Sequence, residues 1–215
     1  MFEKLKNEVD IPAGAERTVR ILLLIENLSH ESVKEIVTKG RTERRIRLLA
    51  DAVKKKYPID FVLECDDPNS EDVMESVIEA IDQCVPLWMI RQMHECNFSA
   101  ASIRKIAAAN VRGIAHKSLR LAIKKDMDSQ QVKLIVDALS LYNTYEQVEV
   151  IADPELDWYQ MQTILRLYVY GLTVNEAKSI VSPLANCKRL MEMGQSLIMS
   201  RKNRSGGAED ENCRS

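Results

Sequence analysis

The side chains best suited to metal binding or nucleophilic catalysis gather at one place in the sequence. Cys84, His94 and Cys96 form the closest group of thiol and imidazole side chains in a chain with 5 Cys and 3 His. Structural zinc sites usually draw their ligands from closely spaced Cys or His pairs such as CxxC, and this group has no such spacing. Positions 94 and 96 would point about 200° apart on a helix. No third group is placed to orient a Cys–His nucleophile pair. The sequence therefore predicts neither a metal site nor a catalytic nucleophile.

Phosphate-binding loops are also missing. Such loops need glycines so that backbone N–H groups can approach the phosphate. The chain has only 7 Gly and contains neither GxxxxGK[ST] nor GxGxxG, and the zinc-protease motif HExxH is absent too. We therefore expect no cofactor, no catalytic residues and no enzymatic activity.

Carboxylates crowd one segment of the chain. Residues 58–83 carry 9 acidic and no basic side chains. The helix dipole favours acids in the first turn of a helix, and several of them fall there. The cluster is interpreted either as a solvated acidic face or as a mimic of nucleic-acid phosphate that competes for the basic groove of a nuclease. The candidate acidic face consists of Glu64, Asp66, Asp67, Glu71, Asp72, Glu75 and Glu79.

Basic side chains recur at helical spacing. Residues 91–126 carry 8 basic and 2 acidic side chains. Lys117, Arg120 and Lys124 follow one another at i, i+3 and i+7, so they share one helix face. Such a stripe could follow a phosphate backbone, or it could pair with acidic neighbours on adjacent helices. The candidates for contact with a partner protein or a nucleic acid are Arg104, Lys105, Arg112, Lys117, Arg120, Lys124, Arg44, Arg47 and Lys54.

Aromatic residues offer a third kind of candidate. Trp88 and Trp158 lie in predicted helices, and Tyr159, Tyr168 and Tyr170 follow the second of them. Aromatic residues at helical spacing usually pack between helices, but exposed ones make good anchors in protein interfaces. Both interpretations stay open.

The elements that must position these side chains are helices. The chain has 215 residues, of which 46% are hydrophobic and 29% charged, with 7 Gly, 6 Pro and 5% aromatic residues. That composition supports a core and disfavours turn-rich β-sandwiches and barrels. Apolar residues recur at three- and four-residue steps, as in the stripe Ile46, Leu49 and Val53. We therefore predict an all-α protein.

Cap-like residues repeat at a fixed distance. Ser70, Ser99 and Asp128 follow one another at 29 residues, and Thr144 and Thr173 are also 29 residues apart. Ser, Thr and Asp suit the N-cap of a helix because their side-chain oxygens accept from free backbone N–H groups. We expect short helices after these caps. A two-helix unit repeated in tandem indicates an α-solenoid, since each unit buries its apolar face against its neighbours.

Longer helices are predicted between the short ones. They cover residues 42–57, 86–97 and 159–171. Asp128 and Thr144 are much closer together than one full repeat, which predicts that one helix is missing there or serves two roles. The fold class is thus an irregular α-solenoid of short and long helix pairs.

The expected domains follow from the breaks in this pattern. An N-terminal helical lobe covers 1–57, an acidic linker 58–69, and a helical-repeat lobe 70–200, with the chain bent near the linker. The strand-like stretch 59–63 is assigned to the linker. The segment 201–215 lacks apolar residues other than Ala208 and Cys213, so it is predicted to be a disordered tail.

The clearest copy of the repeat, residues 143–181, resembles degenerate helical repeats found in proteins of mobile elements and phages of anaerobic gut Gram-positive bacteria. Leu165 stands where Arg is usual in that pattern. The resemblance implies a two-helix repeat fold and a mobile-element setting, and it implies no catalytic residues. The matching positions are Thr144, Glu146, Gln147, Val148, Ala152, Asp153, Pro154, Gln160, Met161, Ile164, Gly171, Leu172 and Thr173.

The functional expectation combines these observations. The net charge is -2, and the longest apolar run, 21–25, is far shorter than a membrane span, so we expect a cytoplasmic protein without membrane contact. We predict a non-enzymatic protein that binds another protein, with an inhibitor of a CRISPR-type nuclease as the specific case that the resemblance suggests. The alternative is a nucleic-acid-binding accessory protein that uses the basic stripe at 91–126.

Overall fold

The computed structural model describes residues 1–25, 28–40, 42–65, 70–141 and 143–211, and these form 14 α-helices and no strand. The predicted all-α class is therefore confirmed. No helix of the described residues is both long and apolar enough to cross a membrane.

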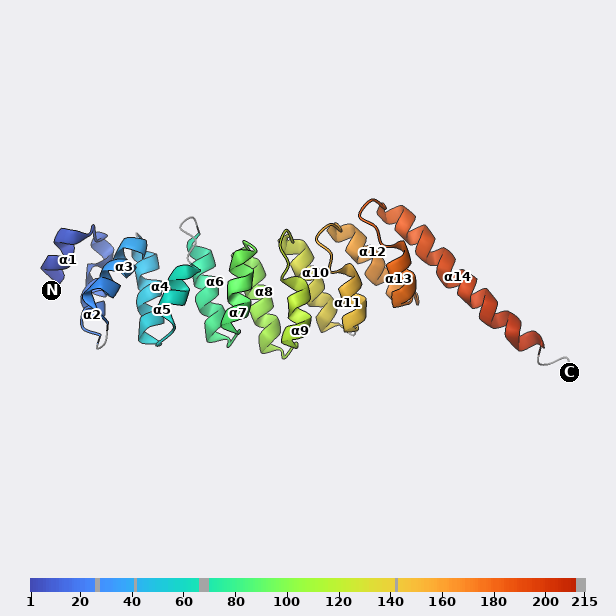
Figure 1. Ribbon diagram of the computed structural model, residues 1–215, viewed down its shortest axis with the longest axis horizontal. Helices are drawn as coiled ribbons and strands as arrows, with labels where there is room; N and C mark the ends of the chain where they lie inside the picture. The colour runs from blue at the N-terminus through green and yellow to red at the C-terminus, as the bar shows by residue number, and fades with distance from the viewer. Residues whose placement is uncertain (26–27, 41, 66–69, 142, 212–215) are drawn as a thin grey trace. The chain divides into compact units, whose positions relative to one another are not determined.

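The chain forms two compact units. The first comprises Met1–His94 and Phe98–Ala107, and the second comprises Glu95–Asn97 and Ala108–Ser215. In each unit, helices that are close in sequence lie beside one another (Figure 1). The helices are α1 (Phe2–Glu8), α2 (Glu16–Leu22), α3 (His30–Gly40), α4 (Glu43–Lys54), α5 (Ile59–Glu64), α6 (Glu71–Asp82), α7 (Leu87–Glu95), α8 (Ala100–Val111), α9 (His116–Leu119), α10 (Ser129–Ser140), α11 (Tyr145–Ile151), α12 (Trp158–Val169), α13 (Val174–Ile180) and α14 (Cys187–Glu211), with 3-10 turns at Ala13–Ala15 and Arg120–Ala122.

The first unit is built around α4, which packs against α2, α3, α5 and α6. Its apolar stripe is fully buried at Ile46 and Leu49, which belong to one core with Leu5, Leu22 and Met74. The expected stripe along this helix therefore forms the core of the unit.

The second unit repeats one arrangement of helices. The long helix α10 packs against α11 and α12, and α12 in turn packs against α14. The short helix α11 packs against α12 and α13. Ile135, Ile151, Ile164 and Leu190 are buried where these helices meet.

The caps at Ser70, Ser99 and Asp128 begin the long helices and not the short ones. Helices α6, α8 and α10 each have 12 residues, and so does α12, whose cap is Asp157, 29 residues after Asp128. Thr144 caps a short helix, α11, of 7 residues. The expectation of short helices after the first three caps is therefore wrong, and no helix is missing after Asp128. Both helix types use the same cap chemistry, so the caps alone could not distinguish two interleaved series.

Buried glutamines show the repeating unit in its hydrogen bonds. Gln131 Nε2 of α10 donates to the carbonyls of Pro154 (3.2 Å) and Leu156 (2.6 Å), and its Oε1 accepts from the backbone N–H of Asp128 (2.7 Å). The same three bonds recur one repeat later, at 3.0, 2.7 and 2.7 Å, around Gln160 of α12. Each amide thus ties the start of a long helix to the loop after the next short helix. The wider solenoid arrangement stays a prediction.

The expected linker at 58–69 is in part a helix. Ile59–Glu64 form α5, in which Phe61, Val62 and Leu63 are buried, and residues 66–69 lie outside the described part of the chain. A short apolar run has no periodicity that distinguishes a strand or a linker from a buried helix. The assignment of residues 59–63 to a linker was wrong for this reason. Helices on both sides of this segment pack within the first unit, so the two units do not divide there.

The predicted disordered tail also needs correction, because α14 continues to Glu211. Arg201 Nη1 donates to Glu176 Oε2 of α13 at 2.7 Å, and its Nη2 donates to the carbonyl of Gly171. These bonds hold the first part of the segment, where polar contacts take the place of apolar packing. Residues 212–215 lie outside the described residues.

We predict that Gln160→Leu lowers the free energy of unfolding by about 2–3 kcal/mol, because two carbonyls and one backbone N–H lose their buried partner. Gln160 is only 4% exposed. The measurement is urea denaturation followed by far-UV circular dichroism. The matched control is Gln162→Leu on the same helix, which should change stability by less than about 0.5 kcal/mol. Equal effects of the two substitutions would contradict the structural role of the buried amide.

Candidate interaction surface

The acidic residues of α6 are paired with cations from the helices on either side. Arg44 of α4 lies 2.8 Å from Glu75 and 3.4 Å from Asp72. Arg104 of α8 lies 3.2 Å from Glu75 and 2.6 Å from Glu79. The hydrogen bond to Glu79 and the nearby carboxylates raise the pKa of Arg104 above its usual value. This part of the acidic face therefore joins three neighbouring helices of the first unit.

The rest of the predicted acidic face divides into two groups. Glu71 also pairs with the α4 arginine, at 3.6 Å, and Glu64 of α5 pairs with Arg91 of α7 at 2.9 Å. Asp66 and Asp67 lie outside the described residues. All described members of the face thus have a cationic partner within the first unit.

The basic candidates of α4 pair within their own helix. Arg47 contacts Glu43, and Lys54 Nζ lies 3.2 Å from Asp51 Oδ1. These pairs span three or four residues, which is the spacing at which helix neighbours meet. Such exposed pairs contribute little stability.

Residues of the basic stripe at 91–126 also make contacts within the protein. Lys124 donates to the carbonyl of Ala152 at the end of α11. Lys117 Nζ lies 4.6 Å from the centre of the Tyr145 ring, and Arg112 Nε donates to the carbonyl of Ala108 at 3.4 Å.

The residues of the basic stripe are divided between the two units, so neither unit carries the whole stripe. Arg104 and Lys105 belong to the first unit, and Arg112, Lys117, Arg120 and Lys124 belong to the second. Lys105 and Arg120 also have partners, so none of the nine basic candidates is unpartnered.

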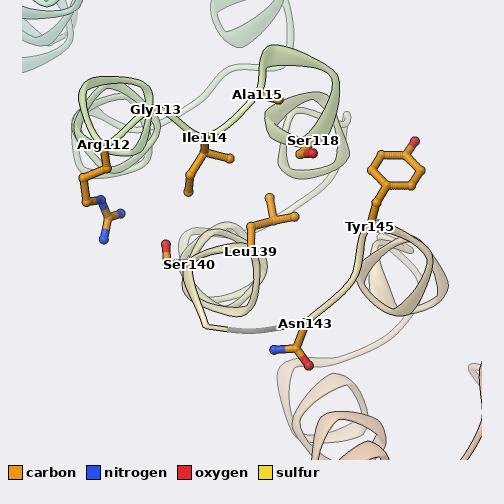
Figure 2. Close-up of a pocket in the computed structure, with 9 residues that line it drawn as sticks. All are labelled: Arg112, Gly113, Ile114, Ala115, Ser118, Leu139, Ser140, Asn143 and Tyr145. Carbon is orange, nitrogen blue, oxygen red and sulfur yellow. The ribbon is translucent and has the colours of Figure 1, made fainter.

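Figure 2 shows a hollow beside the end of α8, in which Ile114 and Leu139 point toward its middle. Arg112 and Tyr145 lie on opposite sides of it. Asn143 also lines it, and its Nδ2 donates to the carbonyls of Ala138 and Leu141. The lining residues offer hydrogen-bonding groups but no acid–base pair and no Cys–His pair.

The thiol and imidazole side chains that the sequence placed closest together are Cys84, His94 and Cys96. Among the described residues, no three His, Cys, Asp or Glu side chains lie together as metal ligands would. Burial raises the pKa of the Cys96 thiol, which disfavours a reactive thiolate.

A groove of about 550 Å³ runs between α10 and α12 in the second unit, and we name it the α10–α12 groove. It continues toward the start of both helices, where Lys133, Trp158 and Tyr159 line it. The two parts are continuous because they share Gln162 and two residues of α10. The walls of the larger part include Leu134, Asp137 and Ala138 of α10 and Leu165, Tyr168 and Val169 of α12.

Large apolar side chains border this groove and are exposed to solvent. Val169 is 84% exposed, Tyr159 67% and Leu141 60%. The three tyrosines near Trp158 differ in exposure, since Tyr159 and Tyr170 are exposed to solvent and Tyr168 is buried. Exposed apolar side chains gathered around a hollow are typical of a surface that binds a partner.

Successive repeats differ in the residues at this helix contact. In the next pair of long helices, Leu167 fills the space beside Gly194, where an added Cβ would lie 2.5 Å from Leu167 Cδ1. The equivalent residues one repeat earlier are Ala138 and Leu165, and both line the groove. The sizes in the pair are thus reversed, with the small residue, Ala138, on the first helix and the large one, Leu165, on the second.

The groove residues Leu134, Leu141, Leu165 and Val169 were not among the candidates chosen from the sequence. The sequence difference at positions 138 and 165 is the exchange of the large and small residues, which becomes visible only when the long helices are aligned one repeat apart. No protein-family model, curated protein or solved structure matches the chain.

We predict that Arg104→Gln lowers the free energy of unfolding by less than about 1 kcal/mol, because its guanidinium and both carboxylate partners are partly exposed to water. The loss should shrink in 1 M NaCl, where charges are screened over about 3 Å. Urea denaturation at low and high salt measures both effects. Lys188→Gln, whose side chain is 87% exposed, is the control and should have no measurable effect. A loss that salt leaves unchanged would contradict an ionic role for Arg104.

Proposed function

We propose that this protein is a non-enzymatic protein-binding module and that the α10–α12 groove holds its partner. The observation that supports the proposal is the exposure of Leu141, Tyr159 and Val169 around one continuous hollow. Burial of this apolar surface would be the main favourable term on binding.

The charges of the groove suit orientation of a partner. Lys133 lies toward one end, Asp137 lies in the shared part, and Arg166 lies toward the other end. Charges of mixed sign at the edge of an apolar surface contribute to specificity and to the rate of association more than to affinity.

The basic stripe supports a nucleic-acid function less well, since its residues already have intramolecular partners. A phosphate backbone would have to compete with the carbonyl of Ala152 for Lys124 and with two carboxylates for Arg104. Protein binding is therefore the function that we favour.

As a specific case, we propose that the partner is a host defence nuclease of the CRISPR type, which the protein inhibits. This step rests on the resemblance of residues 143–181 to repeats of mobile elements, and that segment includes the α12 wall of the groove. Co-purification with candidate nucleases, together with protection of invading DNA, tests it. If a reconstituted partner is not a nuclease, this case falls while the protein-binding function stands.

We predict that the double substitution Leu141→Glu and Val169→Glu abolishes partner binding without unfolding the protein, because both side chains are exposed. Tagged wild-type and variant proteins are purified from cells that express them, retained proteins are identified by mass spectrometry, and the partner is then tested as a purified protein. Two carboxylates in an apolar contact should weaken binding at least about 100-fold.

The matched control is Leu184→Glu, which places the same charge at a leucine that is 97% exposed and lies outside the groove. It should bind like the wild type. The proposal fails if no purified partner binds, or if the double variant and the control bind equally well. Binding to labelled duplex DNA or RNA that falls steeply with salt would instead favour the nucleic-acid alternative.

A further inference from the structure

Exposed side chains of the second unit stand at one equivalent position in successive long helices. The N-caps of α8, α10, α12 and α14 follow one another at 29 residues, as Ser99, Asp128, Asp157 and Asn186. The position at one fixed distance after each cap comes directly after the last residue of α8, α10 and α12 and lies within α14. We name the residues at this position the end row: Arg112, Leu141, Tyr170 and Met199.

Contacts of the second unit bring the helix positions that carry the end row beside one another in order. Arg112 lines the same hollow as Ser140 at the end of α10 (Figure 2). Leu141 lines the groove between α10 and α12. The carbonyl of the residue after Tyr170 accepts from Arg201 of α14, which packs against α12. Each helix position that carries the row is therefore next to the following one.

Three members of the end row are large apolar side chains that are open to solvent. Leu141 is 60% exposed, Tyr170 60% and Met199 58%. Tyr170 and Met199 do not line the α10–α12 groove, so the row extends its apolar surface over α12 to α14. A partner lying along the groove would leave both uncovered, whereas a partner that crosses the long helices would contact one apolar side chain on each.

The distance between neighbouring helices fits a helix that crosses them. Packed helices lie about 8–10 Å apart, and seven residues of an α-helix rise about 10.5 Å. A partner helix that crosses α10, α12 and α14 therefore meets the end row with every seventh residue. Its own backbone groups are paired internally, so it needs only side-chain contacts.

An extended peptide would find little here to bind its backbone. Carbonyls at the ends of α10 and α12 already accept, from Asn143 Nδ2 and from the backbone N–H of Leu172. The residues one turn before the end row differ in charge and in hydrogen-bonding groups, so they do not form a repeated series that could hold a backbone. They are Asp137, Arg166 and Gln195.

Charge gives the bound helix a direction. Arg112 begins the end row, is exposed, and makes one hydrogen bond to the described residues, from Nε to the carbonyl of Ala108 at 3.4 Å. Its two Nη groups can therefore pair with a carboxylate of a partner. The exposed Arg166, one turn before Tyr170, adds a second cation. A second copy of this chain that docked through the same face would bring the same cations with it, so an acidic partner fits better.

We propose that the end row binds an amphipathic helix of a partner protein that crosses α10, α12 and α14. Its apolar residues are seven apart, and a carboxylate one heptad further along pairs with Arg112. The inference rests on the proposed protein-binding function and names the direction and the residue pattern of the bound segment.

The test uses two labelled, stapled helical peptides, each four heptads long and of the same composition. The crossing peptide has Glu in its first heptad and Leu at the same position of the next three. The groove peptide has the same Glu, with its three Leu at i, i+3 and i+7. Fluorescence anisotropy measures the affinity of each for wild type, Tyr170→Ala and Tyr159→Ala. Tyr159 is the matched control, because it lies on the same helix, is 67% exposed, and lines the groove without belonging to the row.

Wild type should bind the crossing peptide at least about tenfold more tightly than the groove peptide. Tyr170→Ala should weaken binding of the crossing peptide about tenfold, and Tyr159→Ala should leave it unchanged. Replacing the Glu of the crossing peptide by Gln should weaken its binding to wild type about threefold and have no effect with Arg112→Gln, because an exposed ion pair contributes little.

The inference is overturned if the two peptides bind equally well, or if Tyr159→Ala weakens the crossing peptide as much as Tyr170→Ala does. Self-association of the wild type that Tyr170→Ala abolishes would overturn it in favour of a second copy. If it is overturned while the Leu141 and Val169 double variant still loses the natural partner, the protein-binding function of the groove stands without a helix that reaches α14.

Discussion

The buried amide of a glutamine three positions after each aspartate cap sets the geometry of the second unit. Gln131 and Gln160 hold the start of a long helix to the loop beyond the next short helix, through bonds that recur from one repeat to the next. The requirement behind them is general, since carbonyls in a buried loop must find donors. Because these bonds place successive helices equivalently, residues one repeat apart meet similar surroundings, and a difference between them has a local consequence.

The groove is the clearest such consequence. Gly194 and Leu167 fill the contact between α12 and α14, whereas the equivalent Leu165 and Ala138 line a hollow between α10 and α12. The same repeat thus gives a closed contact in one place and an open one in the other. The exposed side chains of Leu141 and Val169 lie at this contact, so the hollow coincides with the apolar surface that the proposed partner would cover.

Charge has a more local role than its distribution along the chain suggested. The acidic block on α6 meets Arg44 and Arg104 from the neighbouring helices, so opposite charges that are separated in sequence neutralise one another within the first unit. Pairing with acidic neighbours on adjacent helices is one of the two interpretations that the sequence left open for the basic side chains. Near the surface such pairs stabilise weakly, and they help to define which helix faces meet.

The sequence by itself determined the all-α class, the cap residues and the spacing of the repeat, because helix propensity, apolar periodicity and cap chemistry are local properties. It did not determine which caps begin long helices, that residues 59–64 are helical, or that α14 continues beyond residue 200, because those depend on contacts such as the bond from Arg201 to Glu176. The groove was beyond sequence reasoning for the same reason. Whether residues such as Ala138 and Leu165 line a hollow depends on which side chains of α10 and α12 face one another, and only the tertiary structure decides that.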